Sequence, residues 1–140
     1  MPALTRHPID TQRLIEEAAR PDCGAINIFL GTTRNHHDGR NVLRLSYEAY
    51  EPMAGAALAE IERRVALDFE IETCTIVHRL GEVPIGEASV AVVIASAHRA
   101  AAFEASKWAM DELKRAVPIW KKEFFAEGDE KWVKGRRLGG

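Results

Sequence analysis

Three segments of the chain place apolar residues at the spacing of an amphipathic helix. The first follows Asp10, a residue type that caps helices, and ends before Pro21. The second begins at Pro52 and ends near Asp68, and the third runs from about residue 98 to residue 116. The apolar positions of the first two helices are Leu14, Ile15 and Ala18, then Ala54, Leu58, Ile61 and Val65.

The remaining apolar segments have the length and composition of strands. Residues 24–31 and 88–96 are nearly continuous apolar runs, which predicts buried strands. Residues 32–41 are polar and predict a mobile loop, whereas residues 80–87 contain two glycines and a proline and predict a turn. The other predicted strands are residues 42–50, residues 70–78, a short strand holding Trp120 and Phe124, and a last piece around Trp132 after a turn at Gly128.

Helices separated by pairs of strands favour an α+β fold with a mainly antiparallel sheet. The 140 residues, 46% of them hydrophobic, suit one domain over residues 1–140, with a flexible tail from about residue 134. No apolar run reaches 18 residues and the N-terminus lacks the apolar core of a signal peptide. We therefore expect a cytoplasmic protein that has no membrane contact.

Charge and cysteine content narrow the class of ligand. Residues 114–137 carry eight Lys/Arg against four Asp/Glu, although the whole chain has a net charge of −2. A small anionic ligand suits this local excess better than nucleic acid, which calls for a broader basic surface. Cys23 and Cys74 lie far apart and outside any C-x-x-C motif, so we expect two small buried hydrophobic side chains.

Lys114 and Lys121 flank Pro118 and are the first candidates for chemistry. A helix that ends before the proline places Lys114 in its last turn, and Lys121 then lies on the segment that leaves the corner. Both amines can point into one pocket, where two cations bind anions and lower each other's pKa. The alternative is a pair of solvated lysines near a helix C-terminus.

Further candidates surround this pair. Arg34 follows a strand on a glycine-bearing loop, a good place to grip phosphate or carboxylate, or else a solvated arginine. His98, where a strand leads into a helix, could hold an anion or could simply cap or pack. His36 and His37 lack the spacing of a metal site, so we expect no metal ion or other cofactor. One sector of about 80° on the third helix holds Arg99, Phe103, Lys107, Met110 and Lys114. This face could bind a ligand, or its long side chains could cover apolar surface while their charged ends reach water.

Three blocks in order, residues 29–54, 78–87 and 96–123, resemble the large, catalytic subunits of molybdopterin synthase. The resemblance implies an α/β hammerhead with an additional small antiparallel β-sheet. It also implies a homodimer, in which each subunit binds one small β-grasp sulfur-carrier subunit that ends in Gly-Gly. Together these form a heterotetramer.

The implied activity is that of a sulfurtransferase of molybdenum cofactor biosynthesis. Cyclic pyranopterin monophosphate becomes molybdopterin when two sulfurs are inserted as a dithiolene, and the sulfur arrives as a thiocarboxylate on the partner's C-terminus. An enzyme without an active-site cysteine must import its sulfur in this way. By position, the resemblance makes Lys114 and Lys121 catalytic, with Lys114 leading. It assigns Phe29, Met110, Arg34, His98, Arg99 and, less directly, Arg136 to binding of substrate and tail.

Other functions fit the same residues. One is a dimeric scaffold without chemistry that captures a Gly-Gly tail. Another is a small RNA-binding domain that uses the basic C-terminal quarter with Trp120, Phe124 and Trp132 as stacking groups. The chain itself ends in RRLGG, so its tail could also enter the partner's slot and inhibit; deletion of residues 138–140 would then raise activity.

Overall fold

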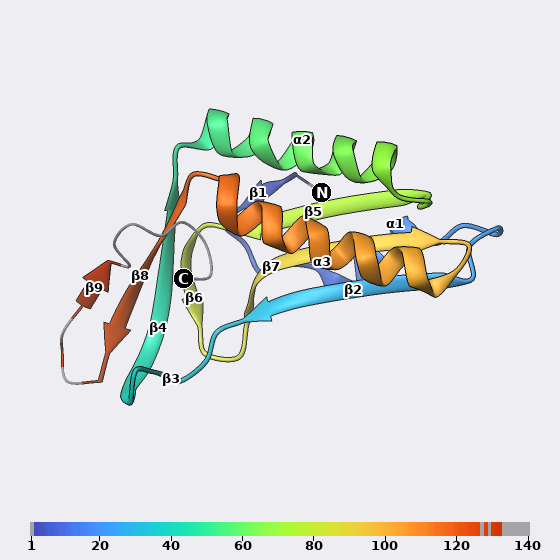
Figure 1. Ribbon diagram of the computed structural model, residues 1–140. Helices are drawn as coiled ribbons and strands as arrows, with labels where there is room; N and C mark the ends of the chain where they lie inside the picture. Colours follow the sequence, from blue (N-terminus) through green and yellow to red (C-terminus); the bar gives the residue numbers. More distant parts are fainter. Residues whose placement is uncertain (1, 127, 129, 133–140) are drawn as a thin grey trace.

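A computed structural model describes residues 2–126, 128 and 130–132. Within these residues the chain forms three helices and two β-sheets (Figure 1). Helix α1 spans Thr11–Ala18, α2 spans Glu51–Asp68 and α3 spans Arg99–Ala116. Asp10 caps α1 by accepting a hydrogen bond from the Arg13 backbone N–H, as the sequence predicts. The four predicted apolar positions of α2 are all buried.

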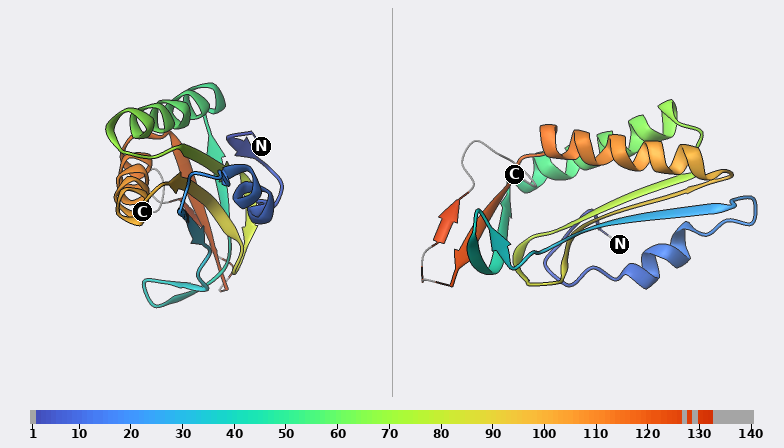
Figure 2. Two further views of the ribbon diagram at one scale, coloured as in Figure 1. Left: turned by 90° about the vertical axis from the view of Figure 1, so that its right-hand side faces the viewer. Right: turned by 60° about the horizontal axis from the view of Figure 1, so that its bottom comes forward.

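The larger sheet has the strand order β1-β5-β7-β2. Its strands are β1 (Leu4–Thr5), β5 (Thr73–Arg79), β7 (Ala88–Ser96) and β2 (Ala25–Thr32), and only the β1–β5 pairing is parallel. Helices α2 and α3 cover one face of this sheet and α1 covers the other (Figure 2). Strand β7 is buried on both faces, as predicted, because it lies inside the sheet and between helices.

Residues 24–31 were predicted to form a buried strand; the strand is present, but the prediction that it is buried was wrong. Strand β2 pairs with β7 alone among the described residues and lies at the sheet edge, so its side chains are half-buried or exposed. An apolar run indicates only that a strand is hydrophobic. The position of the strand in the sheet depends on its pairing with residues that are distant in sequence.

The smaller sheet is antiparallel and runs across the direction of the larger one (Figure 1). It contains β3 (His36–His37), β4 (Arg40–Ala49), β8 (Ile119–Phe125) and β9 (Glu130–Trp132). Strand β6 (Gly81–Pro84) pairs with residues 44–47 of β4, which pair with β8 along their other edge. The predicted mobile loop and turn were therefore partly wrong, since each contains a short strand. Asp38 and Gly39, with φ of 51° and 74°, make the tight turn between β3 and β4.

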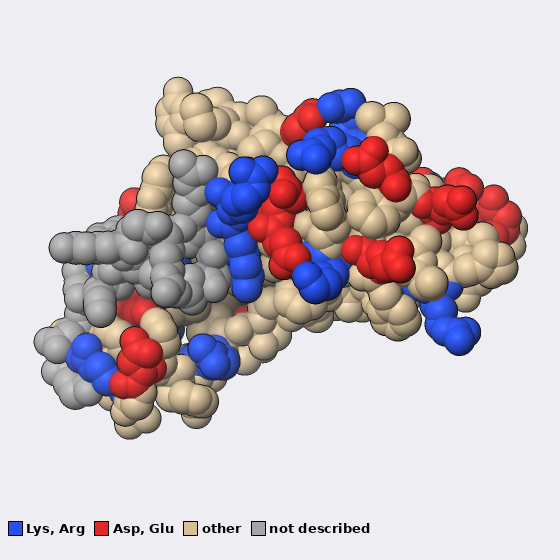
Figure 3. Space-filling model, in the orientation of Figure 1, with Lys and Arg blue, Asp and Glu red and all other residues tan. Residues whose placement is uncertain are grey.

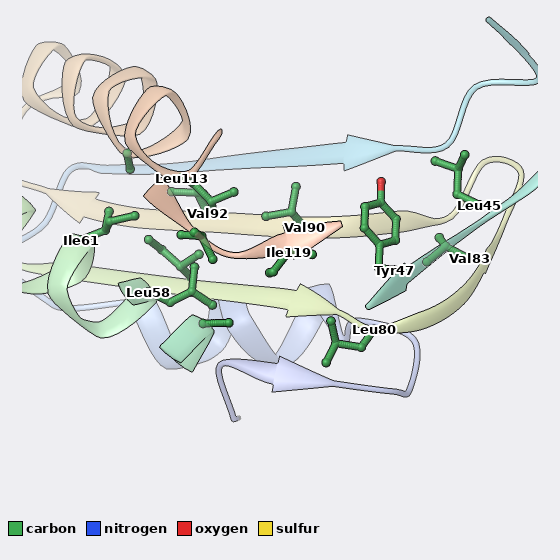
Figure 4. Close-up of a cluster of buried hydrophobic side chains, with 14 of the residues drawn as sticks. Leu45, Tyr47, Leu58, Ile61, Leu80, Val83, Val90, Val92, Leu113 and Ile119 are labelled. Atoms are coloured by element: carbon green, nitrogen blue, oxygen red, sulfur yellow. The ribbon is translucent and has the colours of Figure 1, made fainter. Parts of the chain in front are cut away.

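One apolar cluster joins the helices to both sheets (Figure 4). Leu58 and Leu113 contribute from α2 and α3, Val92 from β7, and Tyr47 from β4. A second cluster lies on the opposite face, beneath α1. Alternate residues of β7 feed the two clusters, as the period of a strand requires. The α+β class and the additional small antiparallel sheet are confirmed.

Candidate functional site

A cavity of about 250 Å³ lies where the two sheets and α3 meet. Helix α3 ends at Ala116, where Pro118 prevents its continuation, and the chain turns directly into β8. Lys114 lies exposed in the last turn of the helix, and Lys121 is 9% exposed on the inward face of β8. Both side chains line the cavity. The structure thus brings the two lysines together from the two elements that flank the proline.

Three other sequence candidates line the same cavity. Phe29 comes from β2, Arg34 from the segment after it, and Met110 from α3, one turn before Lys114. A second groove lies between β2 and α3 and shares Phe29, Met110 and Lys114 with the cavity. The groove therefore leads along the helix to the lysines.

The binding face proposed for α3 lies partly along this groove. Phe103, Lys107, Met110 and Lys114 line it, as one helical stripe. His98 and Arg99 are exposed at the start of α3 and line neither the cavity nor the groove of the same chain. Lys114 follows His98 by sixteen positions along the helix, a rise of about 24 Å at 1.5 Å per residue. Arg136 lies outside the described residues.

Sequence reasoning missed a polar inner wall of the cavity, made by His37, Tyr47, His78 and Glu123. Burial lowers the pKa of His78 to about 4, so its imidazole is uncharged at neutral pH. Its Nδ1–H donates to the carbonyl oxygen of Arg79, at 2.7 Å. Burial raises the pKa of Tyr47, a hydrogen bond with Ser89 opposes this rise, and the nearby Glu123 carboxylate adds to it.

The strand pattern contained one usable signal for this wall. Ile119, Lys121, Glu123 and Phe125 are buried in alternation along β8, so the same period that places Lys121 inward also places Glu123 inward. His37 reaches Glu123 from 86 residues away, and no local pattern indicates that contact. From the sequence, His37 was considered only as a metal ligand. Among residues 2–126, 128 and 130–132 no cluster of three potential metal ligands occurs.

Neither cysteine belongs to the cavity or to the groove. Both are free thiols and half-buried, less buried than the sequence suggested. Burial raises the pKa of Cys74 to about 12, and the pKa of Cys23 is raised as well, chiefly by burial. Thiolate is the nucleophilic form of cysteine, so both thiols are held in the unreactive form.

Positive and negative side chains alternate on the face that α2 and α3 form (Figure 3). Ion pairs within these helices account for much of the pattern, among them Lys107 with Asp111 and Arg115 with Glu112. This face offers no continuous basic surface of the kind that nucleic acid requires. No helix within the described part of the chain is long and apolar enough to cross a membrane.

The fold and the cavity define an α+β protein with a lysine-lined pocket beside a helix C-terminus. The family model described as MoaE protein matches residues 4–116. The chain is 42% identical over 130 residues to the molybdopterin synthase catalytic subunit of Bacillus subtilis (strain 168), covering 93% of this chain and 82% of that protein. It is 49% identical over 134 residues to the molybdopterin synthase catalytic subunit of Dictyostelium discoideum, covering 94% of this chain and 85% of that protein.

Solved structures agree with this relationship. Molybdopterin synthase from Staphylococcus aureus superposes with a TM-score of 0.88 at 34% identity, covering 93% of this chain and 94% of the other. A complex of subunits 1 and 2 of the molybdopterin-converting factor from Helicobacter pylori gives a TM-score of 0.78 at 26% identity, covering 96% of this chain and 90% of the other. The chain belongs to the MoaE family, the catalytic subunits of molybdopterin synthase, and is an enzyme of molybdenum cofactor biosynthesis.

Proposed function

We propose that the cavity at Lys114 and Lys121 is where sulfur passes from a carrier's thiocarboxylate to cyclic pyranopterin monophosphate. The observation that carries the proposal is the meeting of both lysines with Arg34 in a cavity that has no cysteine among its lining residues. The two reactants are anions and repel each other in water. Cations that line one cavity offset that repulsion and stabilise charge that develops on oxygen or sulfur.

The two lysines have different surroundings and therefore different tasks. Lys114 is exposed at the junction of the groove and the cavity, where an incoming tail arrives first, and we assign it the leading chemical role as base or nucleophile. Lys121 is buried on β8 beside the polar inner wall, and we assign it the binding of negative charge that develops on the pterin side.

The groove between β2 and α3 is the proposed path of the carrier's tail. It is lined by Phe103, Met110 and Lys107 and leads to Lys114, and an extended Gly-Gly segment can follow it closely because glycine has no side chain to accommodate. A cationic end at Lys114 then meets the terminal thiocarboxylate. The partner is a small β-grasp subunit, and the Helicobacter pylori relative is itself a complex of two subunits.

A second copy of the chain completes the site in this proposal. A two-fold axis across the middle of α3 places the start of the partner's helix beside the end of the first, because the helices then run antiparallel. His98 and Arg99 of the second copy would lie near Lys114 of the first. Strand β2 supports this contact, since it forms the sheet edge and exposes Ile26 and Phe29. With two carriers the assembly is a heterotetramer, which we place in the cytoplasm.

The test compares turnover with carrier affinity in Lys114→Ala. The chain is mixed with a thiocarboxylated β-grasp carrier and the cyclic pterin, and the dithiolene product is detected after oxidation to its fluorescent form. We expect turnover to fall by about 100-fold or more while carrier affinity stays within about threefold. A scaffold without chemistry would show no turnover in the unaltered chain, and carrier binding would then be its only property.

A further inference from the structure

Glu123 is a buried acid in the cavity that Arg34, Lys114 and Lys121 also line. It is 3% exposed and lies on the inward face of β8, two residues after Lys121. Side chains two residues apart on a strand point to the same side, so this carboxylate and the Lys121 amine enter the cavity together. A buried carboxylate requires a partner, since its desolvation is otherwise too costly.

His37 is a partner that the fold supplies. Its Nδ1 atom lies 2.7 Å from each of the two carboxylate oxygens of Glu123. The β3–β4 hairpin fixes the imidazole, because its turn residue Asp38 follows directly and places a carboxylate oxygen 3.5 Å from Nε2. The ring is therefore held between an exposed acid and a buried one, with Nδ1 directed at the cavity wall.

We propose that His37 is a positioning residue for sulfur transfer, which acts by fixing the Glu123 carboxylate relative to Lys121. Here the proposal rests on the function proposed above, since that assigns Lys121 to the reaction. A carboxylate that loses the His37 donor turns further toward Lys121, which shares its face of β8, and its charge-assisted attraction for that amine strengthens. The amine is drawn from the reactants, and the added negative charge faces the anionic substrate.

Two substitutions of similar size separate this role from a merely structural one. The amide nitrogen of His37→Asn stands near the place of Nδ1 and keeps the donor to Glu123, whereas that of His37→Gln stands nearer the place of Nε2 and loses it. We expect kcat of the Asn variant within about threefold of the unaltered chain and kcat of the Gln variant about 10- to 100-fold lower. KM for the carrier stays unchanged in both. His7→Asn, an exposed histidine before α1, is the control.

A second readout reports on Lys121 without any sulfur chemistry. The rate at which a small acylating reagent labels Lys121, measured by mass spectrometry against the exposed Lys107, falls in His37→Gln and not in His37→Asn. Equal kcat in the two variants, or an unchanged labelling rate, overturns the inference, and so does a loss of kcat that only follows a lower melting temperature. If the unaltered chain forms no dithiolene, the proposed function fails instead, and the labelling rates still decide the role of His37.

Discussion

Lys114 and Lys121 line one cavity although they come from different elements, the last turn of α3 and the inward face of β8. Pro118 between them forces the chain to leave the helix and enter the strand. The reversal converts a spacing of seven residues in sequence into a shared binding surface.

Lys121→Ala is expected to reduce sulfur transfer by about 100-fold, because it removes a buried cation from the cavity. Lys121→Arg keeps the charge and recovers part of the rate. Lys122→Ala is the matched control, since the neighbouring lysine lies over the ring of Phe124 and does not line the cavity. Single-turnover rates with saturating carrier make the comparison, and equal losses at positions 121 and 122 would argue against the site.

His78 makes the stability of the protein depend on pH. Its pKa is about 4 in the folded state against about 6.5 when free, so the unfolded chain binds more protons between these values. The neutral buried ring therefore makes its full contribution to the free energy of unfolding above pH 6.5. That contribution, about 3 kcal/mol, is lost progressively as the pH falls from 6.5 to 4.

Urea unfolding at several pH values between 8 and 5 measures this effect. We expect the free energy of unfolding of the unaltered chain to fall more steeply below pH 6.5 than that of His78→Gln. His7→Gln, an exposed histidine, should retain the steep decrease. Parallel curves for the unaltered chain and His78→Gln would show that His78 is not the group responsible.

Leu58 and Leu67 lie on the same helix and differ only in burial. Leu58 is 0% exposed in the cluster that joins α2 to both sheets, and Leu67 is 69% exposed. Leu58→Ala is expected to lower the free energy of unfolding by about 2–5 kcal/mol, because it removes buried methyl groups and leaves a void. Leu67→Ala should change it by less than about 0.5 kcal/mol. Chemical unfolding of the two variants tests this difference, which a similar loss in both would contradict.

Local periodicity was sufficient to find the helices and their buried stripes. It also found β7, whose apolar run is long enough for a strand buried on both faces. It did not find β3 or β6, because strands of two and four residues exist only through their pairing with β4. The edge position of β2 was missed for the same reason, since pairing between distant residues decides it.

The same limit applies to the site. Lys114 and Lys121 were found because a proline lies between them, and Arg34 because it follows a strand on a glycine-bearing loop. The contact of Glu123 with His37 joins residues 86 positions apart, and the burial of His78 depends on the assembled core, so neither leaves a local pattern. The distance of His98 and Arg99 from Lys114, in contrast, already follows from the helix predicted over residues 98–116, and α3 agrees with that length.

The fate of labelled sulfur tests the central claim most directly. A carrier thiocarboxylate that contains ³⁵S is mixed with the cyclic pterin and with one of three proteins: the unaltered chain, Lys114→Ala/Lys121→Ala, or Cys23→Ser/Cys74→Ala. We expect labelled dithiolene from the unaltered and cysteine-free chains, and at least about 100-fold less from the double lysine variant. Labelled product at the normal rate without the two lysines, or its loss without the two cysteines, would contradict the account.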